Sequence, residues 1–372
     1  MTNLFDYLFW RGDLSFTQDA PNAVDGMILA RLSYFPWERL AVWHRPETVL
    51  PLGEAAAELL ALPELEEIAL QKEDPHLLRV LAESPRFREA TVSDFVCRTD
   101  AETQTQFSAV TLRLTPDCLL LAFRGTDNTL VGWKEDFNMG VVCPVPAQEH
   151  AVRYAEQVAG RYPGTLIFAG HSKGGNLAVY AAAFCGAAVQ ERIRAVYNYD
   201  GPGFDEAVLE SEGYRAVCGR VHTFVPQSSV VGMLLGHREA HTIVHSEQIG
   251  LMQHNLYSWE VRPTGFACLQ TVDSGSRFID YTVKAWIQEM DTEQRERFVD
   301  TVYAVLSETQ AGTLREMGDN WFASAKSVLK SVKNLDEPTR RAVTQALSLL
   351  AHSAYTGWIQ LRQERQEAAP EE

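Results

Sequence analysis

The chain has 372 residues, of which 46% are hydrophobic and 22% charged, a balance typical of a folded globular protein and not of a disordered one. Its formal net charge is −16, from 49 acidic and 33 basic residues, with no dense run of Lys and Arg. Nucleic acid is therefore not an expected partner, because binding to a phosphate backbone depends on clustered cations. The same charge disfavours an anionic membrane surface, although a local patch would still permit peripheral membrane contact.

The sequence also bears on the compartment. No stretch is both long and apolar enough to cross a bilayer, and the best candidate, residues 177–189, is too short. The N-terminal segment carries Asp6 and no basic region before its apolar residues, so no signal peptide is expected. The six cysteines are scattered without a C-x-x-C pair, which in a large chain indicates reduced thiols and a cytoplasmic location. A disulfide in an exported form is the alternative.

The spacing of apolar residues divides the chain into three regions. Residues 1–92 are predicted to be helical, with one helix over 23–40, and to pack on or cap the core. Residues 93–272 open with an antiparallel hairpin and then alternate short apolar strands with helices, which predicts an α/β core with a mainly parallel sheet covered on both faces. The predicted strands are 94–98, 107–114, 118–123, 165–169, 193–199, 220–225 and 241–245. Residues 273–372 predict a helical C-terminal extension.

One segment of the core has the pattern of a nucleophile turn. G-H-S-K-G-G at residues 170–175 follows a buried apolar strand, residues 165–169, and precedes an apolar helix. A G-x-S-x-G motif needs this context to hold its serine on a sharp, strained strand-to-helix turn. The N–H groups and the positive end of the helix would then face an oxyanion formed at Ser172. Ser172 is therefore the predicted nucleophile, and the alternative is a turn with no reactive role.

Several segments resemble known families. The motif at residues 170–175, together with F-R-G-T-D at 123–127 and W-K-E-D at 133–136, is similar to the pattern of the class 3 lipases. The segments 5–14 and 225–232 extend the similarity to a bacterial lipase-like family over much of the chain before the C-terminal extension. The resemblance implies an α/β-hydrolase fold and a serine-hydrolase ancestry, and it implies no particular substrate.

An oxyanion hole needs two donors near the charged oxygen. One follows from the motif, as the backbone N–H of Lys173 directly after the nucleophile. The resemblance implies that the second donor is Thr126, which follows the glycine of the F-R-G-T segment. Asp127 and Asp136 would then orient this loop, and Trp133 would pack beneath it. A structural role for Asp127, paired with the nearby arginine across a turn, is compatible with this arrangement.

The general base is expected downstream of the last strand, because α/β-hydrolases follow the order Ser, acid, His along the chain. His254 follows the strand over 241–245 after a loop, and it is the predicted base. His245, at the end of that strand, and His237 are the alternatives. His171 precedes the nucleophile directly and is expected to be structural, since it points away from the reacting oxygen in similar enzymes.

The carboxylate expected to pair with the general base does not stand where the class 3 lipase pattern places it. Class 3 lipases carry an aspartate after the next-to-last strand, but the corresponding segment here, residues 226–229, contains no carboxylate. Asp200, which follows the strand over 193–199, is the predicted acid because some α/β-hydrolases place theirs at that position. A cap for the turn that Asp200 begins is the alternative role. Ser228, as a neutral substitute for the acid, is the other option.

No cofactor or metal ion is expected. H-R-E-A-H at residues 237–241 has the histidine spacing of a zinc-binding helix, but its glutamate comes one position late and the apolar residues that follow favour a strand. The chain contains no G-x-x-x-x-G-K-[ST] loop, so nucleotide hydrolysis has no support.

These residues together predict a cofactor-independent serine hydrolase that acts on a small-molecule carboxylic ester, either a lipid or a short acyl ester. Ser172 would attack the carbonyl, and His254 would transfer the proton. Thioesterase or amidase chemistry would use the same residues. The alternative from another class is a degenerate α/β-hydrolase fold that serves as a binding or scaffold module. The oligomeric state is left open.

Overall fold

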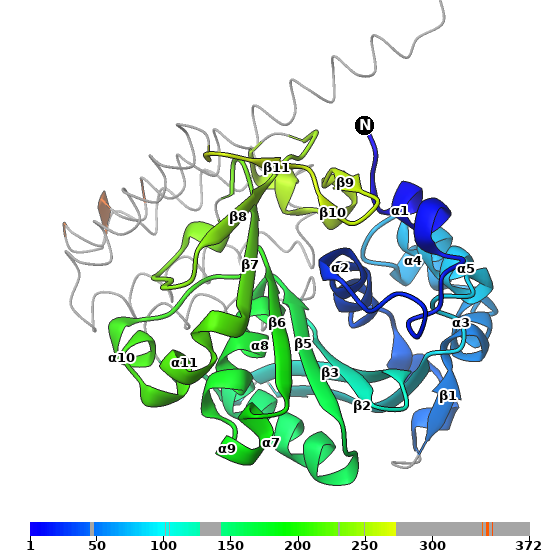
Figure 1. Cartoon of the computed structure of the whole chain (residues 1–372), viewed down its shortest axis with the longest axis horizontal. Helices are drawn as coiled ribbons and strands as arrows, with labels where there is room; N and C mark the ends of the chain where they lie inside the picture. Colours follow the sequence, from blue (N-terminus) through cyan, green and yellow to red (C-terminus); the bar gives the residue numbers. More distant parts are fainter. Residues whose placement is uncertain are drawn as a thin grey trace, which may run out of the picture.

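The structure is a computed structural model that describes residues 1–44, 48–100, 102–103, 105–126, 143–229, 231–248 and 250–272, together with 337, 340, 341 and 344. In this part of the chain the fold is mixed α/β and is built on one large sheet (Figure 1). The predicted α/β class, with parallel strands at the centre of the sheet, is confirmed. The predicted C-terminal extension lies outside the described residues except at those four isolated positions.

The large sheet, within the described ranges, has the strand order β1-β2-β3-β4-β5-β6-β7-β8-β11. Strands β4 to β8 run parallel to their neighbours, whereas β1 to β4 and the pair β8 and β11 are antiparallel. The parallel centre brings the carboxyl ends of its strands to one edge, where open α/β sheets carry their sites. The strands of the large sheet are β1 (Val49–Pro51), β2 (Thr91–Asp100), β3 (Thr105–Thr115), β4 (Cys118–Phe123), β5 (Thr165–His171), β6 (Ile193–Tyr199), β7 (Val221–Pro226), β8 (His241–Val244) and β11 (Cys268–Leu269).

Helices cover both faces of this sheet (Figure 1), because successive side chains of each strand point to opposite faces. Leu120 and Ala122 of β4 belong to the core under the N-terminal helices, while Leu119 and Leu121 belong to the core under α7 and α8. The helices are α1 (Leu4–Arg11), α2 (Ala23–Leu32), α3 (Leu52–Leu60), α4 (Leu65–Ile68), α5 (Asp74–Glu83), α7 (Pro146–Arg161), α8 (Lys173–Phe184), α9 (Ala187–Gln190), α10 (Glu206–Leu209) and α11 (Glu212–Val217).

Short elements complete the described part of the fold. The 3-10 helices are η1 (Trp37–Arg39), η2 (Ala41–His44), η3 (Cys218–Arg220), η4 (Val231–Met233), η5 (Gly250–His254) and η6 (Leu256–Ser258). A separate antiparallel pair is formed by β9 (Val261–Arg262) and β10 (Gly265–Phe266). None of the helices in the described residues combines the length and the apolar character that a membrane span requires.

Helix α2 ends at Leu32, so the helix predicted over residues 23–40 is too long. In a longer helix the Leu32 carbonyl would accept a hydrogen bond from residue 36, but Pro36 has no backbone N–H. The indole of Trp37 donates to that carbonyl instead, at 2.7 Å. The chain therefore turns after Leu32 and continues as short 3-10 helices.

Two buried ion pairs fix the N-terminal helices. Arg31 binds Asp74 with two hydrogen bonds of 2.7 and 2.5 Å, and Arg86 binds Asp25 with two of 2.8 and 2.6 Å. All four side chains are buried. The helices share one continuous hydrophobic core with the sheet, and the boundary predicted at residue 92 falls inside β2. The division into domains stays a prediction.

Candidate active site

Ser172 stands on a strained turn between β5 and α8. Its backbone has φ 57° and ψ −134°, a conformation that costs a residue with a side chain about 1–3 kcal/mol. The Ser172 N–H donates to the Tyr199 carbonyl at 2.9 Å, and the Gly175 N–H donates to the Ser172 carbonyl at 2.8 Å. Ser172 itself is partly exposed. The turn therefore holds its shape by backbone hydrogen bonds and leaves the serine accessible from solvent.

Glycines make this turn sterically feasible. A Cβ on Gly170 would lie 2.0 Å from the Gly174 carbonyl oxygen, and a Cβ on Gly174 would lie 2.1 Å from the Phe123 carbonyl oxygen. Any side chain at either position would force β5, α8 and the end of β4 apart. The glycines of the G-x-S-x-G motif are therefore required by the close packing of the turn.

The chain after β4 runs beside the turn. A Cβ on Gly125 would lie 2.5 Å from the His171 carbonyl oxygen and 3.2 Å from Ser172 Cβ. Thr126, the next residue, is therefore carried close to the serine. Lys173 is the first residue of α8, where backbone N–H groups have no partner within the helix. Lys173 follows Ser172 directly and Thr126 follows Gly125, which packs against the turn, so both residues expected to donate to an oxyanion lie near the serine.

His254, at the end of η5, meets Asp200. The two atoms His254 Nδ1 and Asp200 Oδ2 are 2.7 Å apart. The ring centroid of His254 is 4.3 Å from that of His171, the residue directly before Ser172. The Asp200 side chain is 1% exposed and the His254 side chain 26% exposed. The structure therefore brings the predicted acid and the predicted base together, with the base against the residue that precedes the predicted nucleophile and the acid sheltered from water.

The second carboxylate oxygen of Asp200 is held by the loop after β7. Asp200 follows β6 with φ 51°, and its N–H donates to the Phe224 carbonyl at 2.8 Å. Its Oδ1 accepts a hydrogen bond from Ser229 Oγ at 2.5 Å and another from the Gly232 N–H at 3.1 Å. A Cβ on Gly232 would lie 2.4 Å from that oxygen, so only glycine fits there. These contacts fix the orientation of the carboxylate.

Sequence reasoning missed Ser229 and Gly232. It weighed the neighbouring Ser228 instead, and the structure shows the backbone N–H of Ser228 donating to Gln253 Oε1 at 2.8 Å. The hydroxyl beside Asp200 belongs to Ser229. The one signal in the sequence for this loop is the family resemblance over residues 225–232.

The two alternative bases each contact a carboxylate other than Asp200. His245 Nδ1 lies 2.6 Å from Glu260 Oε2, and His237 Nδ1 lies 2.9 Å from Glu239 Oε1. Of these three histidines, His254 is the one that contacts Asp200 in the described part of the chain.

No metal centre is evident in the described ranges, where no group of three or more His, Cys, Asp or Glu side chains could hold an ion. Residues 241–244 form β8, so the H-x-x-x-H spacing does not lie on one helix as a zinc-binding helix requires. All six cysteines are free thiols.

Three residues expected to support the oxyanion loop, Asp127, Trp133 and Asp136, lie outside the described residues. Their roles stay predictions. Arg124, just before this segment, is buried, and its Nη2 donates to Cys97 Sγ at 3.4 Å.

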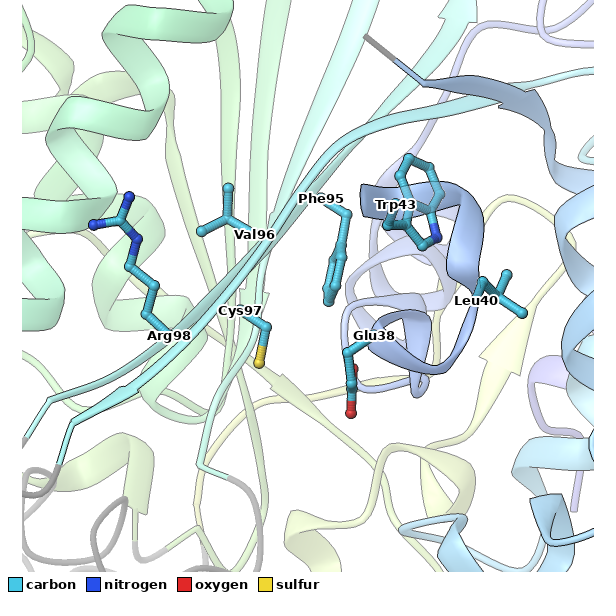
Figure 2. A pocket seen from close by; sticks show the side chains of 7 residues that line it. All are labelled: Glu38, Leu40, Trp43, Phe95, Val96, Cys97 and Arg98. Carbon is cyan, nitrogen blue, oxygen red and sulfur yellow. The ribbon is translucent and has the colours of Figure 1, made fainter. Parts of the chain in front are cut away.

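A groove of about 330 Å³ lies between β2 and the short helices η1 and η2. Figure 2 shows Phe95 and Cys97 of β2 on the side that faces Trp43 and Leu40, with Val96 on the opposite side. Strands β3 and β4 separate β2 from β5, so the groove is about 14 Å from the strand that carries the serine. We assign this groove no part in the site at Ser172.

The strand order and the strained serine turn after β5 define a protein with the α/β-hydrolase fold. The Mbeg1-like family model matches residues 81–304, more than half of the chain, and the protein belongs to this lipase-like family. Two solved structures are similar at 13% sequence identity. The M37 lipase has a TM-score of 0.36, covering 57% of this chain and 70% of its own. A triacylglycerol lipase from Penicillium expansum has a TM-score of 0.30, covering 49% and 82%. A comparison with curated proteins found no match.

Proposed function

We propose that this protein is a serine hydrolase that cleaves carboxylic esters of lipids or of short acyl chains through an acyl-enzyme on Ser172. The observation that carries the proposal is the 2.7 Å contact between Asp200 and His254, next to the strained turn that presents the serine. Membership of a lipase-like family supports the same reaction class.

The first half of the reaction forms the acyl-enzyme. Asp200 accepts the hydrogen bond from Nδ1–H of His254, which leaves Nε2 as the basic nitrogen. As Ser172 Oγ bonds to the carbonyl carbon, Nε2 takes the hydroxyl proton. The backbone N–H groups of Lys173 and Thr126 donate to the oxyanion that results. The bond to the alcohol oxygen then breaks, and the alcohol leaves with the proton from His254.

The second half releases the acid. Water attacks the acyl carbon, and His254 takes one proton from it. When the ester bond to Ser172 breaks, that proton returns to Oγ and the carboxylic acid departs. The two halves together consume one ester and one water.

The contact between Asp200 and His254 also favours the hydrolase over a binding or scaffold module. The scaffold alternative was motivated by the lack of an aspartate after β7 and by the helices predicted at both ends of the chain. Asp200 answers the first point, because it supplies a carboxylate from the end of β6. Thioesters and amides would react at the same residues, so a substrate panel separates these activities.

The test is covalent labelling together with ester hydrolysis. We expect a fluorophosphonate to label the wild type once, and Ser172→Ala to lose the label and at least about 10⁴-fold in kcat on p-nitrophenyl butyrate. Ser15→Ala, on an exposed turn, is the matched control and should behave as wild type. The proposal fails if the wild type takes no label and hydrolyses no ester, thioester or amide between acidic and alkaline pH.

A further inference from the structure

His171 lies between the nucleophile strand and the loop that carries His254. Its side chain is buried, and its Nε2 is 2.8 Å from the backbone carbonyl oxygen of His254. A carbonyl oxygen can only accept a hydrogen bond, so Nε2 of His171 must carry the proton and donate. The bond therefore ties the residue before the nucleophile to the main chain of the proposed base.

Tyr34, in the turn after α2, sets the other side of the His171 ring. Its hydroxyl is 3.1 Å from His171 Nδ1 and 3.0 Å from the His171 carbonyl oxygen. The single hydroxyl proton of Tyr34 is donated to the His171 carbonyl oxygen, and with Nε2 protonated the Nδ1 atom of the neutral ring can only share that proton. A Cβ on Gly125 would lie 2.1 Å from the Tyr34 hydroxyl oxygen, so the oxyanion segment packs against the same group. One buried cluster thus joins the N-terminal region, the nucleophile and the base.

The surroundings keep His171 neutral. Burial lowers its pKa well below the ordinary value, and the charges of His254 and Arg31 lower it further. The Arg31 guanidinium lies 4.7 Å from the centre of the Tyr34 ring and is held by Asp74. A neutral ring matters because the His254 imidazolium forms beside it, at a centroid distance of 4.3 Å. A second cation there would oppose the proton transfer.

We propose that His171 is a positioning residue: its Nε2–H holds the main chain of His254 so that, with Asp200 bonded to Nδ1, the basic nitrogen of His254 faces Ser172. This inference rests on the proposed function. Asp200 fixes one ring atom of His254, and Ser228 and Trp259 hold the neighbouring Gln253. The bond from His171 adds a restraint on the backbone of His254 itself, so that ring and backbone are both held. A displacement of about 1 Å in a catalytic group can lower a rate about 100-fold.

The experiment compares replacements that differ in whether they reach the His254 carbonyl. His171→Phe and His171→Asn remove the donor at Nε2, while His171→Gln places an amide N–H at that distance. His222→Phe, on the exposed side of β7, is the matched control. We measure kcat and KM on p-nitrophenyl butyrate, the rate of fluorophosphonate labelling, and the midpoint of thermal unfolding.

The proposal expects kcat and the labelling rate to fall about 100-fold in the Phe and Asn variants. It expects KM to change less than about threefold, since substrate binding is not affected, and it expects the Gln variant to recover most of kcat. If the Phe variant does not fold, the contrast between Asn and Gln decides the question. Wild-type kcat in the Asn variant, or equal losses in Asn and Gln that follow their melting temperatures, would overturn the positioning role. A wild type that is labelled at Ser172 separates that outcome from failure of the proposed function.

Discussion

Asp200 is the residue that sets the tautomer of His254 in the proposed mechanism. Its carboxylate binds Nδ1 on one side and the loop after β7 on the other. Asp200→Asn keeps the shape but favours the tautomer with Nε2 protonated, which cannot accept the proton of Ser172. We expect kcat to fall about 10⁴-fold. Ester hydrolysis measures the effect, with the exposed Asp13→Asn as control, and a loss below about tenfold would contradict the role.

The side chain of Lys173 has a structural role that can be tested separately from its backbone N–H. It is 1% exposed, and its Nζ donates to the Gln106 carbonyl at 3.0 Å and to Gln106 Oε1 at 2.7 Å. The side chain therefore links the start of α8 to β3. Lys173→Met leaves buried acceptors without this donor, so we expect the free energy of unfolding to fall by about 2 kcal/mol. Urea unfolding measures it, and a variant as stable as wild type would show that the link contributes nothing.

At the scale of elements, the loop from β7 to β8 is fixed by carboxylates at both of its ends. Asp200 holds its first part, and Glu239, whose side chain is 3% exposed, holds its last part. Glu239 accepts hydrogen bonds from Tyr214, from Thr223 at 2.5 Å and from His237 at 2.9 Å. Burial raises the pKa of Glu239, but His237 and the two hydroxyls outweigh burial and lower it to about 2.

This lowered pKa predicts how stability depends on pH. A carboxyl group whose pKa falls on folding, here from 4.5 to about 2, stabilises the fold fully above the higher value. That contribution is lost as the pH falls from 4.5 toward 2. Glu239→Gln should therefore lower the free energy of unfolding at neutral pH by about 3 kcal/mol. The free energy of unfolding of this variant should also depend less steeply on pH than that of the wild type as the pH falls below 4.5. Urea unfolding at a series of pH values tests this. The prediction is refuted if the free energies of unfolding of the variant and of the wild type fall in parallel at acidic pH.

The sequence predicts those elements whose determinants are local. The apolar strand, the glycines and the apolar helix around Ser172 lie within one short stretch, and that turn forms as expected. The early end of α2 depends on Pro36 and on the indole of Trp37, which donates to the Leu32 carbonyl. The spacing of apolar residues does not reveal either effect. The pairing of Asp200 with His254 joins residues 54 positions apart. A sequence pattern alone cannot separate that role from a turn cap, because both need a carboxylate at the end of β6.

At the scale of the whole molecule, the N-terminal helices and the sheet share one core. Helix α2 packs on β4 and β5, and Asp74 binds both Arg31 and the hydroxyl of Tyr257, at 2.7 Å. Asp74→Asn leaves the buried guanidinium without its counter-ion, so we expect a loss of about 3–5 kcal/mol. Hydrogen exchange should show equal losses of protection in α2 and β5, because the two unfold together. Loss of protection in α2 alone would mean that the N-terminal region folds separately.

The central claim is that Ser172, His254 and Asp200 form one catalytic unit, and a crystal structure of the phosphonate adduct tests it most directly. We expect phosphorus bonded to Ser172 Oγ, with its free oxygen about 3 Å from the backbone nitrogens of Lys173 and Thr126. We also expect His254 Nε2 within about 3.2 Å of the Ser172 oxygen while Nδ1 stays on Asp200. Phosphorus on another residue, or an adduct with His254 turned away from Ser172, would contradict it.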